Sequence, residues 1–315
     1  MSPRILVIRG GAIGDFILTL PAIRLLRENF PRARIEILGY KHIVALAHGR
    51  FYADDSRSIE YGALAPFFIP NGNLAPDLVE FFRSFNQVIS YLFDPDGIFD
   101  ANLRRCGVKH LIVGSPKIDD SEHAACQLAR PLQALALYLE NPGATVHPAP
   151  EDREFADRFL GQVRPPFLAI HPGSGSERKN WPLEKWLALC RWLGSLDPAL
   201  SLLLVGGEAD GKRLSALAQA IQSIKVARDL PLCQLAALME RCALFLGHDS
   251  GISHLAAAAQ ARCLLFFGPT DPEIWAPANP GVTVIRAPGG AMEKLELLTV
   301  QEGVRQILLP LQLRT

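Results

Sequence analysis

A glycine-rich turn that ends in an aspartate is the first stretch of the chain whose residues could do chemistry. It runs Gly10-Gly11-Ala12-Ile13-Gly14-Asp15. Glycines let the backbone approach a ligand closely, and a carboxylate at that place can take a proton from a hydroxyl group. A dinucleotide-binding fingerprint would need a glycine at Arg9, so the turn disfavours NAD binding. The alternative interpretation of Asp15 is a simple helix cap.

Three clusters in the second half combine groups that suit a nucleotide diphosphate. Lys179, in the small-residue stretch 171–182 (HPGSGSERKNWP), can neutralise a phosphate. Glu208, in VGGEAD, can accept hydrogen bonds from ribose hydroxyls. The stretch 247–259 (GHDSGISHLAAAA) begins a helix whose free N–H groups and dipole favour an anion. Each cluster also has a structural interpretation: a solvated lysine, a helix-capping acid and a packed histidine.

The elements that would position these residues repeat a strand, a loop and a helix in both halves. Apolar runs typical of buried parallel strands lie at 4–8, 34–40, 87–92, 110–113, 167–171, 200–207, 242–249 and 262–268. Ligands bind outside the carboxyl ends of such strands, where the polar clusters fall. The prediction is an α/β protein with two Rossmann-like, doubly wound domains facing each other across a cleft. The proline-rich segment 141–166 would join the domains, 1–150 and 151–315.

Two further segments carry local predictions. Residues 62–77 have neither a helical nor a strand period, which predicts an irregular loop that either functions or is a mobile surface segment. Thr299 and Glu302 have the spacing of a capping box and predict the start of a last helix, which could pack back on the N-terminal domain.

Composition excludes several function classes. The 315 residues carry 32 basic and 32 acidic side chains, so no excess of positive charge points to nucleic acid. The six cysteines lie in apolar stretches without a C-x-x-C pair, and no Asp-x-Asp pair or histidine cluster suggests a metal site. The sequence shows neither a signal peptide nor an apolar run of the roughly 18 residues that a membrane span needs. We therefore expect a cytoplasmic protein with reduced thiols.

Taken together, four segments resemble glycosyltransferase family 9, the ADP-heptose:lipopolysaccharide heptosyltransferases. They are IRGGAIGDFILTLPAIRLLRENFP, HPGSGSERKNWP, DSGISHLAAA and FGPTDP. The resemblance implies a GT-B fold in which the N-terminal domain holds the acceptor and the C-terminal domain holds the donor. Peripheral contact with the inner membrane would be compatible with a lipid-linked acceptor.

The resemblance also implies roles for individual residues. Asp15 matches the catalytic aspartate, and Gly11 and Gly14 belong to the acceptor-side loop. The donor-binding residues match Ser174, Lys179, Glu208, Leu230, Asp249, Ser250, Gly251 and His254. The chain departs from the family where Gly11 and Ala12 replace two hydroxyl residues, and residues 41–150 lack a dense basic cluster for a phosphorylated lipid core. The identity of the acceptor is therefore open.

The functional expectation is an inverting, metal-independent transfer of a sugar, with heptose and ADP implied by the resemblance. The acceptor would be a lipopolysaccharide core or a related glycan or glycolipid, and no cofactor is expected beyond the nucleotide-sugar substrate. Two alternatives stay open. A GT-B nucleotide-sugar epimerase would need acid/base pairs in both domains, and a catalytically silent sugar-nucleotide-binding protein would bind nucleotide without hydrolysis or transfer.

Overall fold

The computed structural model describes residues 2–161, 163, 166–196, 200–221 and 224–312. The chain divides into two compact units, Met1–Pro142 and Gly143–Thr315. The division falls inside the proline-rich segment 141–166, eight residues before the expected boundary between 150 and 151.

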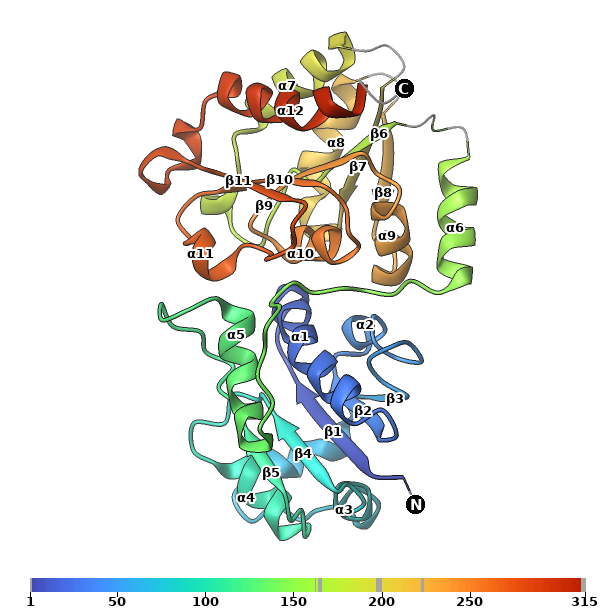
Figure 1. The fold of residues 1–315 in the computed structure, drawn as a ribbon, viewed down its shortest axis with the longest axis vertical. Helices are drawn as coiled ribbons and strands as arrows, with labels where there is room; N and C mark the ends of the chain where they lie inside the picture. The colour runs from blue at the N-terminus through green and yellow to red at the C-terminus, as the bar shows by residue number, and fades with distance from the viewer. Residues whose placement is uncertain (1, 162, 164–165, 197–199, 222–223, 313–315) are drawn as a thin grey trace. The chain divides into compact units, whose positions relative to one another are not determined.

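The first unit is built on a five-stranded parallel sheet in the order β3-β2-β1-β4-β5. Its strands are β1 (Arg4–Arg9), β2 (Arg34–Gly39), β3 (Asp55–Ser58), β4 (Gln87–Ser90) and β5 (Leu111–Val113). Its helices are α1 (Ile13–Asn29), α2 (Lys41–Val44), α3 (Pro76–Arg83), α4 (Ile98–Arg105) and α5 (Ala124–Ala129), with 3-10 turns η1 (Gly62–Phe68) and η2 (Arg130–Leu135). Figure 1 shows β1 between β2 and β4, with α1 and α5 side by side. All four predicted strands of this half are confirmed.

The first unit differs from the sequence expectations in two places. Strand β3 was not predicted because its sequence, DSRS, is polar and lies at the edge of the sheet beside β2. The segment 62–77 is irregular only in part, because η1 covers Gly62–Phe68 and α3 begins at Pro76, while residues 69–75 lie in no helix or strand. Leu64 and Phe67 of η1 are buried in the core, where Phe67 packs against Phe82.

The second unit is built on a six-stranded parallel sheet in the order β11-β10-β9-β6-β7-β8. Its strands are β6 (Phe167–Ile170), β7 (Ser201–Gly206), β8 (Lys225–Arg228), β9 (Leu244–His248), β10 (Cys263–Phe267) and β11 (Val282–Arg286). Its α-helices are α6 (Pro150–Leu160), α7 (Leu183–Leu196), α8 (Gly211–Ala220), α9 (Leu232–Met239), α10 (Gly251–Ala258), α11 (Pro272–Trp275) and α12 (Leu297–Gln312). Short 3-10 turns are η3 (Glu177–Lys179), η4 (Glu208–Asp210), η5 (Pro288–Gly290) and η6 (Met292–Lys294).

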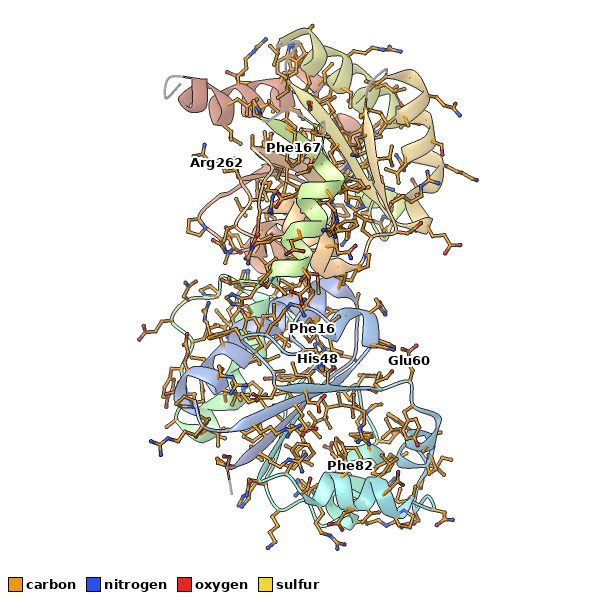
Figure 2. The ribbon with its side chains drawn as sticks, turned by 90° about the vertical axis from the view of Figure 1, so that its right-hand side faces the viewer. Phe16, His48, Glu60, Phe82, Phe167 and Arg262 are labelled. Carbon is orange, nitrogen blue, oxygen red and sulfur yellow. The ribbon has the colours of Figure 1, made fainter. Side chains whose placement is uncertain are left out.

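The central strands of each sheet are apolar and buried on both faces, as parallel sheets covered by helices require. Phe16 and Phe167, labelled in Figure 2, are 1% and 2% exposed and lie in the interiors of the first and second units respectively. In the second unit, Trp181 and Trp186 form a T-shaped pair beside Phe266 and are fully buried.

The last helix starts earlier than predicted. Helix α12 begins at Leu297, so Thr299 lies inside its first turn and the expected Thr299/Glu302 capping box does not start it. Val300 and Val304 of α12 belong to the core of the second unit, where the helix lies against α7.

The order of strands places a switch point in each sheet. The chain leaves β1 toward β2 on one side and later adds β4 on the other, and β6 has the same relation to β7 and β9. Crevices at switch points, outside the carboxyl ends of the strands, are where doubly wound sheets bind ligands. The segments after β1, β6 and β9 therefore hold most of the candidate site residues.

Candidate active site

The turn after β1 folds back on the carboxylate of Asp15. Gly11 has a φ of +97°, in the region that favours glycine, and a Cβ there would lie 2.8 Å from Asp15 Oδ2. The same oxygen accepts a hydrogen bond from the N–H of Ala12 at 2.8 Å. The Asp15 side chain is 37% exposed. The turn thus fixes one carboxylate oxygen while the group stays accessible to a ligand. Gly14 lies in the first turn of α1.

A buried arginine lies beneath this turn. Arg9 is 3% exposed, and its Nε donates to Thr19 Oγ1 at 3.0 Å. Its Nη2 donates to the backbone oxygen of Asp15 at 3.3 Å and lies 3.8 Å from Asp15 Oδ1. Burial lowers the pKa of the Arg9 guanidinium, and the charge of Asp15 opposes that effect. Arg9 therefore supports both the backbone and the carboxylate of Asp15.

In the second unit, three loops meet at the carboxylate of Asp249, which follows β9. Lys179, from the loop after β6, places its Nζ 2.6 Å from Asp249 Oδ2. Thr270, from the loop after β10, donates its hydroxyl to the same oxygen at 2.8 Å. Asp249 is 8% exposed as a side chain, whereas Lys179 is 29% exposed. Asp249 therefore fixes the position of the Lys179 ammonium group, and the other N–H donors of that group are available to a ligand.

Helix α10 begins beside this ion pair. Ser250 is its N-cap, and the Ser250 hydroxyl accepts a hydrogen bond from the N–H of Ser253 at 3.3 Å. Gly251 is the first helical residue, and the absence of a side chain there leaves the helix start open. His254 is 5% exposed in the first turn, and its N–H donates to the Ser250 carbonyl at 3.2 Å. A helix start with its dipole and a nearby ammonium group favours a bound anion.

A second buried chain of hydrogen bonds links the loops after β6, β7 and β9. His171 Nε2 lies 3.2 Å from Asp210 Oδ2, and His171 Nδ1 lies 3.3 Å from Ser250 Oγ. Burial raises the pKa of Asp210, but the hydrogen bond and charge of His171, the Gly207 N–H and Arg213 outweigh it, so the pKa lies below its usual value. The ionised Asp210 carboxylate accepts a hydrogen bond from His171 Nε2–H, and His171 Nδ1 lies within hydrogen-bond distance of the Ser250 hydroxyl.

Close packing makes a glycine necessary in this loop. A Cβ on Gly173 would lie 1.8 Å from Asp210 Oδ1. Any side chain at position 173 would displace Asp210 from His171, so the hydrogen-bond chain requires a glycine there.

The His248 ring connects the two ends of the loop after β6 through hydrogen bonds. Its Nε2 accepts from the Trp181 N–H at 2.9 Å, and its Nδ1 donates to the Gly173 carbonyl at 3.2 Å. These partners fit a neutral ring with the proton on Nδ1. Burial, which is complete, is the largest cause that lowers the pKa of His248, to about 3.

The remaining predicted donor residues lie at the same edge of the sheet. Glu208 is exposed at the start of η4, directly after β7. Ser174 follows β6, and its hydroxyl donates to the Ser176 carbonyl at 2.8 Å. Leu230 follows β8 and is half-buried before α9. All follow parallel strands of one sheet, whereas Asp15 lies in the other unit.

The sequence analysis singled out neither Arg9, His171, Asp210, His248 nor Thr270 as a site residue. His171, Asp210 and Thr270 lie in the quoted stretches HPGSGSERKNWP, VGGEAD and FGPTDP, in the loops that follow strands. The position after a strand was the signal that could have identified them. Within the described residues, no group of three or more His, Cys, Asp or Glu could hold a metal ion.

Comparisons with known proteins place this architecture. The family model of glycosyltransferase family 9 (heptosyltransferase) matches residues 113–304. Lipopolysaccharide heptosyltransferase 1 of Escherichia coli O18:K1:H7 is 27% identical over 41% of this chain and 39% of its own length. Lipooligosaccharide heptosyltransferase 2 of Haemophilus influenzae is 26% identical over 52% and 49%. The matched stretches thus span about half or less of these relatives.

Longer similarities appear in other comparisons. Lipopolysaccharide heptosyltransferase 3 of Escherichia coli is 23% identical over 84% of this chain and 83% of its own length. The family 9 glycosyltransferase of Veillonella parvula is structurally similar with a TM-score of 0.82 and 18% identity, over 98% of this chain and 97% of its own. The E. coli heptosyltransferase WaaC with ADP has a TM-score of 0.72 and 18% identity, over 96% and 99%. The prediction of a GT-B fold with two parallel-sheet α/β domains is confirmed.

Proposed function

Because the chain belongs to glycosyltransferase family 9, we propose that it transfers a heptose from a nucleotide-diphosphate donor to a lipopolysaccharide-core or related glycan acceptor. The names of its relatives support the transferred sugar and the acceptor class. They favour transfer over epimerisation and over a silent binding protein. We propose ADP as the nucleotide, because structurally similar heptosyltransferases were solved with ADP and with an ADP-linked sugar.

The observation that carries this proposal is the meeting of Lys179, Asp249 and the start of α10 at the switch point of the second sheet. Asp249 holds the Lys179 ammonium in place, and the helix start adds partial positive charge. The Lys179 ammonium group and the start of α10 would each bind one of the two phosphates of a nucleotide diphosphate. Glu208 lies beyond the neighbouring strand β7, where its carboxylate would accept hydrogen bonds from the ribose.

The chemical step follows from the same groups. Asp15 takes the proton of the acceptor hydroxyl while the hydroxyl oxygen forms a bond to the anomeric carbon of the donor sugar. The bond from that carbon to the diphosphate breaks, and its electron pair leaves with the diphosphate. Lys179 and the N–H groups at the start of α10 stabilise the charge that develops there. A single displacement of this kind inverts the configuration.

Calorimetry with ADP and AMP tests the donor site. ADP should bind more tightly, because only ADP places a second phosphate between Lys179 and the helix. Equal affinities for the two nucleotides would remove the diphosphate site from the proposal. UDP and GDP in the same titration test the choice of adenine.

The metal-free mechanism has its own test. Transfer should persist in EDTA, because the cation and the helix dipole replace a metal in stabilising the leaving group. Loss of activity in EDTA with recovery in Mg²⁺ would contradict it.

Over the described residues, the structure contains no helix long and apolar enough to cross a membrane. We propose that a lipid-linked acceptor brings the protein to the surface of the inner membrane.

A further inference from the structure

Asp15 lines a pocket of about 440 Å³ in the first unit. Its walls come from the ends of β1, β2 and β4 and from the segment that follows β3. The lining residues are Arg9, Gly10, Gly11, Asp15, Tyr40, Ile59, Glu60, Phe68, Tyr91, Leu92, Phe93 and Pro116. These lining residues all belong to the first unit, so the chemistry of the pocket is considered within that unit.

The charged groups of the lining are mainly acidic. Asp15 and Glu60 contribute two carboxylates. Among the described residues, the Glu60 carboxylate has no hydrogen-bond or ion-pair partner, and Figure 2 shows its side chain extending away from the ribbon. The lining's single cation, Arg9, is buried and already donates to Thr19 and to backbone oxygens. A negatively charged ligand would therefore meet two like charges in the lining, where Arg9 is already engaged.

The lining also contains apolar aromatic rings that are exposed to solvent. Tyr40, Phe68 and Phe93 are 36%, 46% and 59% exposed, although large apolar side chains are usually buried. The Phe68 ring stacks on the buried Phe99, with ring centroids 5.0 Å apart. The Lys117 ammonium lies 4.5 Å from the centroid of the Phe93 ring, just outside the lining. These rings are held in place and offer apolar faces beside the carboxylates.

Resting on the proposed function, we propose that the acceptor group bound at Asp15 is an uncharged sugar ring, not a carboxylated or phosphorylated one. A neutral sugar has an apolar C–H face and an edge of hydroxyl groups. Its face covers the aromatic rings, and its hydroxyls donate to Asp15 and Glu60, which only accept. An acyl chain would cover the rings but would offer no hydrogen-bond donor to either carboxylate.

A matched pair of small glycosides tests the proposal without donor or turnover. Methyl glucoside and methyl glucuronide differ only at C6, which is a CH₂OH group in one and a carboxylate in the other. Saturation-transfer NMR titrations of the full chain should show the glucoside binding at least about tenfold more tightly, because the uronate carboxylate is repelled by Asp15 and Glu60. Equal binding, or tighter binding of the glucuronide, would overturn the proposal.

Variants locate the effect. Phe93→Ala should weaken glucoside binding, and Glu60→Gln should reduce the difference in binding affinity between the glucoside and the glucuronide. Tyr138→Ala is the matched control, because Tyr138 is 64% exposed in the same unit but does not line the pocket. If Phe93→Ala affects binding no more than Tyr138→Ala does, the aromatic wall is wrongly assigned.

Two further measurements separate the remaining outcomes. Lys117→Ala should leave the preference for the glucoside unchanged, and a gain in that preference would show that Lys117 recruits anions. Hexanol should not compete with the glucoside, and competition would identify a lipid-binding wall instead.

If the chain binds no ADP in calorimetry but prefers the glucoside, the proposed function fails and the preference of the pocket for a neutral sugar is retained. If ADP binds and the glucuronide is preferred, only the acceptor class fails.

Discussion

His248 should make the stability of the second unit depend on pH between neutrality and pH 5. The ring is fully buried, accepts from Trp181 and donates to Gly173, and its pKa is lowered from 6.5 to about 3, chiefly by burial. A protonated ring would aim an N–H at the Trp181 N–H. His248 is therefore neutral in the folded state, whereas in the unfolded chain it takes up a proton below its unfolded pKa of 6.5.

The sign and size follow from this linkage. A histidine with a lowered folded pKa contributes stability above the unfolded pKa, and this contribution is lost as pH falls from 6.5 toward 3. At pH 5 the unfolded chain gains about 2 kcal/mol from protonation of this one residue, since each pH unit below the unfolded pKa contributes about 1.4 kcal/mol. That loss does not depend on the exact folded pKa, because pH 5 lies far above it.

Urea unfolding followed by circular dichroism at pH 7.5 and pH 5.0 measures the loss. His248→Gln is the informative variant, because an amide can accept from Trp181 and donate to Gly173 but does not titrate. The variant should be less stable at pH 7.5, yet its stability should fall by about 2 kcal/mol less than that of the wild type on going to pH 5.0. His110→Gln, at an exposed histidine in the first unit, is the control. If His248→Gln and the wild type lose equal stability, His248 is not buried as a neutral ring.

The other predictions concern the proposed transfer. Asp15→Asn should keep ADP affinity but reduce turnover by about 10²-fold or more, because an amide cannot take the acceptor proton; normal turnover would remove Asp15 as the base. Lys179→Ala should weaken ADP binding by roughly tenfold or more in calorimetry, because it removes a charged hydrogen bond. The double variant with Asp249→Asn should recover folding stability but not affinity, and recovered affinity would assign Lys179 a purely structural role. Glu208→Ala should weaken ADP more than 2′-deoxy-ADP, and equal losses would place Glu208 away from the ribose.

The sequence predicted the framework well because apolar runs determine buried strands. The runs at 4–8 and 167–171 became β1 and β6, the strands beside both switch points. The polar edge strand β3 lacked that signal, and η1 was missed because its buried residues, Leu64 and Phe67, follow no simple period.

Side-chain pairing was less predictable from sequence. Lys179 and Asp249 were expected in one site, but their ion pair joins residues 70 positions apart and depends on the order of strands. VGGEAD contains two acids, and only the structure distinguishes the exposed Glu208 from Asp210, which turns inward to His171. Local sequence cannot distinguish them, because the direction of each side chain is determined by the turn and by Gly173.

The paired tryptophans give the molecule an optical property. Trp181 lies two residues after Lys179, is sealed from water, and donates its indole N–H to the Leu295 carbonyl at 2.9 Å. Trp186 meets the His248 ring edge-on, with centroids 5.4 Å apart. Indoles in so dry a place emit at shorter wavelengths than solvated ones, and a protonated imidazole quenches a nearby indole. The intrinsic emission of the unmodified protein should therefore shift to longer wavelengths when water reaches the two indoles and dim when His248 takes up a proton.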